Sequence, residues 1–251
     1  MKLLVANWKM NPGTPKEAEK LLREVVRARP PKGVSVAICL PYPYLALAKK
    51  IVSAKKNPSI GVQNIFWQGP VGAYTGEVSG EMARAMGARY VILGHSERRL
   101  NLHETDEMVA KKTAAALKAG LTAVVCVGEP LAVREEGEKM AEAYVIRQLE
   151  AILTEVPNPD TKKLIIAYEP FWAISTAKDR RICSSEIAAN MMNAIRALLQ
   201  RRTARREWNI LYGGSVSVGN AVEFLGLGEG ALIGGVSLKI AEFAAILKLF
   251  S

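Results

Sequence analysis

The sequence predicts an α/β fold, a (β/α)8 barrel that forms a single domain over residues 1–251. Short apolar runs rich in β-branched residues alternate with amphipathic segments along the whole chain, which is typical of βαβ units around a parallel sheet. The alternation recurs at intervals of roughly 30 residues, and a chain of 251 residues has the length that such a barrel requires. No linker rich in Pro, Gly or Ser divides the chain, so we expect one domain.

The predicted strands are short apolar runs, expected at Leu3–Asn7, Val34–Cys39, Ser59–Gln63, Tyr90–Leu93, Ala123–Val127, Leu164–Ala167, Asn209–Tyr212 and Ala231–Ile233. The predicted helices carry an apolar stripe and are expected at Pro15–Ala28, Tyr44–Ser53, Thr105–Ala119, Glu138–Leu153, Ser185–Gln200, Val218–Phe224 and Leu238–Leu249. A doubly wound open sheet is the competing fold. It needs a Gly-rich turn after the first strand, and residues 8–11 read Trp-Lys-Met-Asn instead.

The composition is that of a folded protein, with 49% hydrophobic and 23% charged residues. No apolar run approaches the ~20 residues of a membrane helix, and the N-terminal residues do not read as a secretion signal. Cys39, Cys126 and Cys183 are too scattered for a disulfide framework or a zinc site. We therefore expect no membrane association and a reducing, cytoplasmic location.

The net charge of +10 raises the prospect of anionic partners. Apart from one late cluster the basic residues are dispersed, and that cluster has no interleaved aromatic residues; it comprises Arg196, Arg201, Arg202, Arg205 and Arg206. This pattern favours a solvated helix end over a nucleic-acid-binding patch.

His95 lies where a predicted strand meets a predicted helix. It follows Gly94 directly, Ser96 suits the N-cap position, and Glu97 suits a first helical turn. The positive end of a helix disfavours imidazolium, so we expect a neutral ring with a pKa below the usual value of ~6.5, and we expect this ring to donate a hydrogen bond to a carbonyl oxygen. The alternative is a His that only satisfies backbone groups at a turn.

Other polar residues follow predicted strands, at the rim where barrels of this class carry their chemistry. Asn7 and Lys9 follow the first strand, and Glu169 follows the sixth, between Tyr168 and the run Pro170–Trp172. Apolar neighbours predict a raised pKa for Glu169 and hence a stronger base. Singly, each has an ordinary structural explanation, but their convergence on one rim favours a catalytic site.

Glycine-rich turns follow the last two predicted strands. Gly213-Gly214-Ser215 follows the seventh strand and Gly234-Gly235 follows the eighth. Glycine lets backbone N–H groups approach an anion, and these are the places where barrels commonly hold a phosphate. The alternative is that both are simply tight turns.

Several motifs, in this order, resemble those of the triosephosphate isomerases: Asn7–Asn11, Gln63–Asn64, Tyr74–Ser79, Gly94–Arg99, Cys126–Glu129, Tyr168–Ala173, Tyr212–Val216 and Gly234–Leu238. The resemblance runs from Val5 to about Leu238. It implies a TIM barrel and an isomerase of glycolysis and gluconeogenesis that interconverts dihydroxyacetone phosphate and D-glyceraldehyde 3-phosphate without cofactor or metal. A neutral catalytic His and a Glu base are well known in this family, and the resemblance implies the same pair here.

The resemblance also assigns roles to residues. Glu169 would move the proton, neutral His95 would polarise the carbonyl, Lys9 and Asn7 would contact the substrate, and Glu97 would orient Lys9. The phosphate would be held by Ser175, Ser215, Gly234 and Gly235. Ile174, Thr176 and Leu232 would form the lid and clamp, and Cys126 would pack behind the site.

The resemblance implies a homodimer as well, through the long segment Phe66–Val78, with Thr75 near the partner's site. The lid departs from the family pattern, because Ser175 and Ala177 replace glycines, and Asp179 and Arg180 replace small residues. Two other functions stay open: a different phosphate-binding barrel enzyme and a non-catalytic binding protein. Neither is expected to keep Lys9, His95 and Glu169 together.

Overall fold

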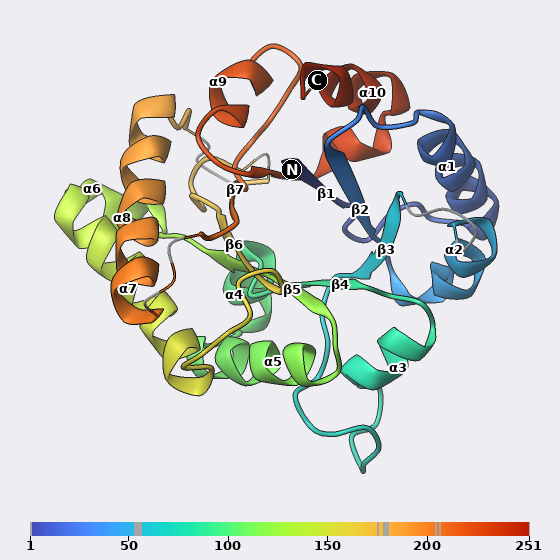
Figure 1. Ribbon diagram of the computed structural model, residues 1–251, viewed down its shortest axis with the longest axis horizontal. Coiled ribbons are helices and arrows are strands. Elements are labelled where there is room, and N and C mark those ends of the chain that lie inside the picture. The colour runs from blue at the N-terminus through green and yellow to red at the C-terminus, as the bar shows by residue number, and fades with distance from the viewer. Residues whose placement is uncertain are drawn as a thin grey trace.

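The computed structural model is a closed barrel of parallel strands in the order β1 to β8, surrounded by helices (Figure 1). It describes residues 2–52, 57–174, 176–177, 181–203, 205 and 207–250. The strands are β1 (Lys2–Asn7), β2 (Val34–Cys39), β3 (Ser59–Val62), β4 (Tyr90–Leu93), β5 (Thr122–Val127), β6 (Leu164–Tyr168), β7 (Ile210–Tyr212) and β8 (Gly230–Ile233). Leu3 pairs with Gly230 and Ala6 with Ile233, so β1 closes the sheet against β8. The predicted (β/α)8 barrel is confirmed, and the open doubly wound sheet is excluded.

The outer layer consists of α1 (Pro15–Arg27), α2 (Leu45–Val52), α3 (Gly80–Ala85), α4 (Ser96–Leu102), α5 (Asp106–Lys118), α6 (Leu131–Glu135), α7 (Glu138–Glu155), α8 (Ser185–Thr203), α9 (Ala221–Leu225) and α10 (Ile240–Leu249). Short 3-10 turns occupy Tyr42–Tyr44 and Gly235–Leu238. The second turn delays the last helix, which begins at Ile240 rather than at the predicted Leu238. None of the described helices has the length and apolar character needed to cross a membrane.

Successive side chains of each strand point to opposite faces of the sheet, and this divides the apolar core into two layers. In β1, Leu3 and Val5 belong to the cluster inside the barrel, while Leu4 and Ala6 belong to the larger cluster between strands and helices. All four side chains are buried. All eight strand pairs are parallel, so every strand delivers its last residues to the same end of the barrel.

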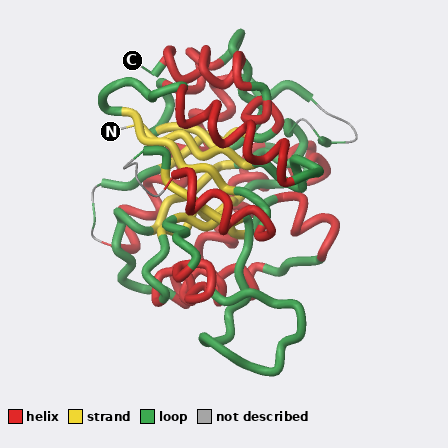
Figure 2. The backbone as a smooth tube through the Cα atoms, turned by 90° about the vertical axis from the view of Figure 1, so that its right-hand side faces the viewer, coloured by secondary structure: helices red, strands yellow, loops and turns green. Residues whose placement is uncertain are grey.

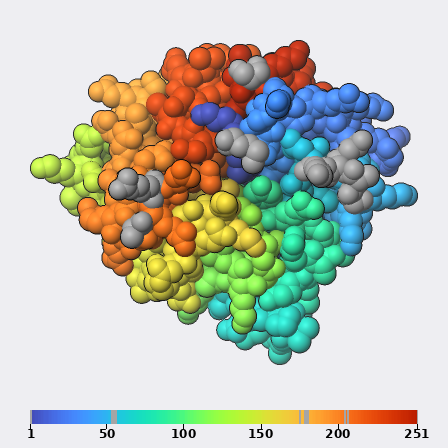
Figure 3. Space-filling view, in the orientation of Figure 1, coloured from blue at the N-terminus to red at the C-terminus, as the bar shows by residue number. Residues whose placement is uncertain are grey.

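The face seen in Figure 3 is the one at which the strands begin, with the first residues of β1 near its centre. At the other end lie the loops that follow the strands. One long loop projects from the body between β3 and α3 (Figure 2). Its stem is closed by Phe66, whose N–H donates to the Val78 carbonyl at 2.8 Å.

Candidate functional site

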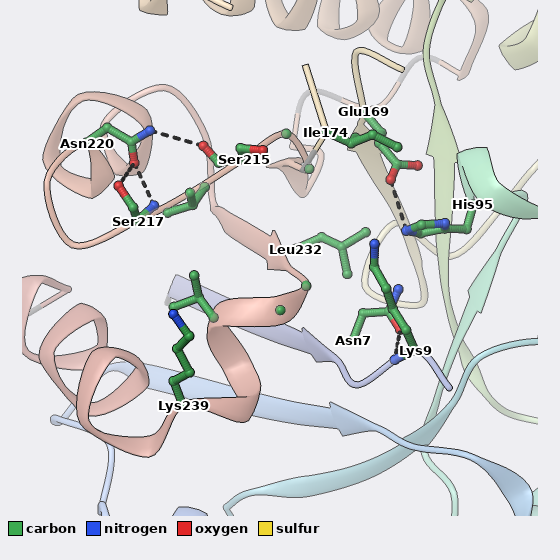
Figure 4. A pocket seen from close by; sticks show the side chains of 16 residues that line it. Asn7, Lys9, His95, Glu169, Ile174, Ser215, Ser217, Asn220, Leu232 and Lys239 are labelled. Carbon is green, nitrogen blue, oxygen red and sulfur yellow. Dashed lines mark hydrogen bonds and ion pairs between the residues drawn. The ribbon is translucent and has the colours of Figure 1, made fainter. Parts of the chain in front are cut away.

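A pocket of about 390 Å³ opens at the ends of β1, β4, β6, β7 and β8 (Figure 4). The residues that line it come from segments far apart in the sequence: Asn7, Lys9, His95, Glu169, Ile174, Gly213, Gly214, Ser215, Val216, Ser217, Asn220, Leu232, Gly234, Gly235, Val236 and Lys239. Most residues proposed for the site from sequence are therefore brought together here. Ser175 lies outside the described residues.

His95 and Glu169 form a direct pair at the floor of the pocket. The His95 Nε2 atom lies 2.9 Å from Glu169 Oε1, and the backbone N–H of Ser96 donates to Glu169 Oε2 at 2.9 Å. Glu169 is only 1% exposed. The carboxylate is thus held between two donors and shielded from water.

The cap of α4 differs from the sequence prediction. His95, rather than Ser96, is the N-cap residue, and its Nδ1 accepts the N–H of Glu97 at 3.2 Å. A ring nitrogen that accepts carries no proton. In its neutral form His95 therefore has its proton on Nε2, the nitrogen that faces Glu169.

The predicted pKa shifts of this pair are wrong in direction. Burial lowers the pKa of His95, but the charge and hydrogen bond of Glu169 and the charge of Glu97 raise it, and the net shift is upward. Burial raises the pKa of Glu169, but the charge and hydrogen bond of His95 and the bonds from Ser96 lower it, and the net shift is downward. The apolar neighbours of Glu169 and the helix end at His95 could be read from the sequence. The contact between the two side chains, which come from different strands, could not.

Lys9 reaches the same pocket from the end of β1. Its Nζ donates to Glu97 Oε1 at 2.6 Å, and its backbone N–H donates to Asn7 Oδ1 at 3.0 Å. The predicted pairing of Lys9 with Glu97 is present in the structure. Lys9 has a φ of 54°, a left-handed conformation that costs a non-glycine residue energy and marks functional sites.

Glu97 also contacts the loop after β6. Its Oε1 accepts the hydroxyl of Thr176 at 3.0 Å, so one oxygen holds both Lys9 and a residue from the loop after β6. Burial raises the pKa of Glu97, but the hydrogen bond and charge of Lys9, with smaller contributions from His95 and Thr176, lower it overall. Thr176 does not line the pocket; it contacts the site only by its hydrogen bond to Glu97.

The glycine turns form the opposite wall. A Cβ on Gly214 would overlap the Tyr212 hydroxyl, and one on Gly234 would crowd Lys9 Cε at 3.2 Å. The Ser215 hydroxyl donates to the Ala173 carbonyl at 2.8 Å, which joins the seventh-strand turn to the start of the lid. Small residues are therefore required where the chain passes close to the site.

The first part of the loop after β6 is held by a buried carboxylate. Glu129 Oε1 accepts from Trp172 Nε1 at 2.9 Å, from the Tyr168 hydroxyl at 3.1 Å and from Arg134 at 2.7 Å. Ile174 and Leu232 line the pocket as expected for a clamp. Of the departures from the family pattern, Ala177 is described, and Asp179 and Arg180 lie outside the described residues.

Behind the pair, Cys126 is fully buried, and burial raises the pKa of its thiol well above the usual value. Sequence reasoning gave no role to five lining residues, Val216, Ser217, Asn220, Val236 and Lys239. Asn220 and Lys239 lie several residues beyond their strand ends. Their distance from the glycine motifs is the reason that strand-end reasoning did not find them.

The fold and the pocket define the class of protein, a (β/α)8-barrel enzyme with a paired imidazole and carboxylate at its mouth. The family model described as triosephosphate isomerase matches residues 2–250. A triosephosphate isomerase of Herminiimonas arsenicoxydans is 42% identical over 251 residues, and that of Thermus thermophilus is 42% identical over 252 residues. In both cases the alignment covers 98% of this chain and 98% of the relative. The chain belongs to the triosephosphate isomerase family.

Proposed function

We propose that this chain interconverts dihydroxyacetone phosphate and D-glyceraldehyde 3-phosphate in the pocket, through an enediolate, as a step of glycolysis and gluconeogenesis. The observation that carries the proposal is the buried Glu169 carboxylate, 2.9 Å from His95 Nε2 in a pocket that also holds Lys9 and both glycine turns. Family membership and the names of the relatives support the reaction. The roles of individual residues are inferred from the geometry.

Glu169 is the proposed base. A proton next to a carbonyl is weakly acidic, and its removal needs a positioned carboxylate with little water around it. Glu169 takes the proton from one carbon, is itself protonated, and returns the proton to the neighbouring carbon. Meanwhile His95 Nε2 gives its proton to the former carbonyl oxygen of the enediolate and takes a proton back from the neighbouring hydroxyl. Before substrate binds, His95 and Ser96 outweigh burial and lower the pKa of Glu169, so the carboxylate is ionised. A substrate that separates Glu169 from His95 removes the main lowering influence, and burial then raises this pKa and makes the carboxylate a stronger base.

His95, Lys9 and Asn7 are the proposed partners of the substrate oxygens. A substrate between the ring and Glu169 takes over the Nε2–H donor, so its carbonyl oxygen receives the hydrogen bond as negative charge develops. Separation of the pair also removes the main influence that raises the pKa of His95, and burial then favours the neutral ring. Lys9 supplies positive charge, and Glu97 fixes its position at 2.6 Å.

The phosphate is proposed to lie against Ser215, Gly234 and Gly235, opposite the reacting pair. Ser175 is a further proposed phosphate contact, and Ile174, Thr176 and Leu232 are the proposed lid and clamp. A closed lid keeps water away, which protects the enediolate from losing its phosphate as methylglyoxal forms. We also propose that the chain acts in the cytoplasm as a single catalytic domain.

A second pocket supports the proposed homodimer. It measures about 520 Å³ and lies beside Lys9, His95 and Glu97, where Met10 is 94% exposed. The projecting loop carries Val71 at 80% exposure. In the same loop the Phe66 ring packs at a tilt against the rings of Trp67 and Tyr74, with centroids 4.3 and 4.8 Å away. We propose that this loop enters the pocket of a second copy; the alternative is a surface loop packed only on itself.

Two measurements test these proposals. A coupled assay with either triose phosphate should show turnover, whereas a different phosphate-binding barrel enzyme or a non-catalytic binding protein would show none. Light scattering should give twice the mass of 27.3 kDa. An active species of 27.3 kDa at assay concentration would reject the dimer.

A further inference from the structure

Asn220 uses its side chain in an unusual way for a helix N-cap. It precedes α9, where an Asn normally accepts an N–H of the first turn, yet it makes no side-chain cap hydrogen bond. Its amide points back along the chain instead, toward the turn after β7 (Figure 4).

The amide of Asn220 bridges the two sides of the turn. Its Nδ2 donates to the Ser215 carbonyl at 3.0 Å, and its Oδ1 accepts the Ser217 N–H at 2.7 Å and the Ser217 hydroxyl at 3.2 Å. Val216 lies between these two serines and is buried. The single amide therefore fixes the backbone on both sides of one residue.

The braced turn is continuous with the lid. Ser215, whose carbonyl Asn220 holds, donates its hydroxyl to the Ala173 carbonyl at 2.8 Å. Asn220 and both serines line the same pocket as Glu169. A hydrogen-bonded chain thus runs from the start of α9 through the turn to the first residues after Trp172.

We propose that Asn220 is a positioning residue for the substrate phosphate: it holds the Ser215 turn in the shape that accepts the anion. The proposal rests on the proposed function, in which this turn contacts the phosphate. Donors that are already oriented do not have to be ordered when the ligand binds, whereas a loose turn adds that ordering to the free energy of binding. Asn220 itself touches backbone rather than the reacting atoms.

The main test compares Asn220→Ala with two other variants. Ser217→Ala removes only the 3.2 Å hydroxyl contact, so a smaller effect is expected. Asn190→Ala is the matched control, because Asn190 is an exposed residue of α8 that bonds to Glu138, away from the pocket. The probes are inorganic phosphate, followed through the backbone amide signals of Ser215, and the isomerase assay.

Asn220→Ala should raise the dissociation constant of inorganic phosphate and the KM for triose phosphate by about tenfold, the effect of losing roughly one net hydrogen bond. Its kcat should stay near the wild-type value, because phosphate contacts are lost equally in the ground state and the transition state. Deuterium exchange into glyceraldehyde, which has no phosphate, should be unchanged. That last measurement also shows that the variant is folded.

A variant with a lowered Tm but wild-type KM and phosphate affinity would overturn the proposal, since Asn220 would then only stabilise the fold. An equal loss with glyceraldehyde would overturn it too. If the wild type binds phosphate at this turn but does not isomerise triose phosphates, the proposed function fails while the role of Asn220 is still decided by phosphate affinity. Absence of phosphate binding in the wild type would reject both.

Discussion

Glu169→Gln separates the charge of this side chain from its shape. The site presents two donors to the carboxylate, His95 Nε2–H and the Ser96 N–H, both at 2.9 Å. A Gln amide has one acceptor and one donor, so it satisfies one of them and opposes the other. The amide cannot relieve this by turning over, because His95 Nδ1 already accepts from Glu97.

We expect kcat to fall by about 10³- to 10⁴-fold, or roughly 4 to 5.5 kcal/mol of barrier, the contribution of a positioned general base. The unmatched donor costs about 1–3 kcal/mol of stability, offset in part because a buried charge is removed. The variant should therefore fold and still bind substrate. Without the negative charge, burial dominates and the pKa of His95 should drop.

Steady-state assays with both triose phosphates measure kcat. A pH titration followed by ¹⁵N NMR of the imidazole ring measures the pKa of His95. Glu186→Gln, on an exposed part of α8, is the control and should change neither. Turnover within tenfold of the wild type would refute the assignment of the base. A pKa of His95 that stays in place would refute the electrostatic reasoning.

Three further predictions concern stability and charge. Glu104→Gln should cost about 3–5 kcal/mol, because it leaves Lys112 buried without its carboxylate. Burial raises the pKa of Glu104, but Lys112 and Arg98 outweigh it and lower this pKa below 4.5. The wild type therefore keeps the stabilisation above pH 4.5 and loses it as the pH falls further. Urea titrations at several pH values should show that the stability of Glu104→Gln lacks this part of the pH dependence. His103→Gly should raise the free energy of unfolding by about 1 kcal/mol, since His103 has a φ of 54°, and thermal denaturation would contradict the reasoning if Tm fell. Lys9→Met should lower kcat/KM by about 10²- to 10³-fold, and steady-state kinetics that showed less than a tenfold loss would argue against a role for its charge.

Much of the fold was predictable because apolar period and strand length are local properties. The predicted strand Tyr90–Leu93 matches β4, and the predicted helix Thr105–Ala119 contains α5 with one residue to spare at each end. The short helices α3 and α6 were not predicted, because six and five residues are too few to display a helical period. The start of α4 was expected from Ser96 and Glu97, but its seven residues were too few for the whole helix to be predicted.

The candidate site likewise contains residues that could be predicted from the sequence and residues that could not. Residues at the end of a strand or directly after it, such as Asn7 and Glu169, were found because a barrel brings all strand ends to one rim. The pairing of Glu169 with His95 depends on side chains on different strands, and their pKa shifts follow from that pairing. Asn220 was missed because its role is to brace a neighbouring turn, and no motif marks it.

Closure of β1 onto β8 has a consequence for synthesis. Until residues 230–233 leave the ribosome, β1 and β7 each present a row of unpaired backbone groups. Such edges recruit other strands, and a closed barrel has none. The last tenth of the chain therefore converts a nascent product prone to self-association into a sheet with no free edge, and a product truncated before Gly230 should aggregate even though most of its core has been made.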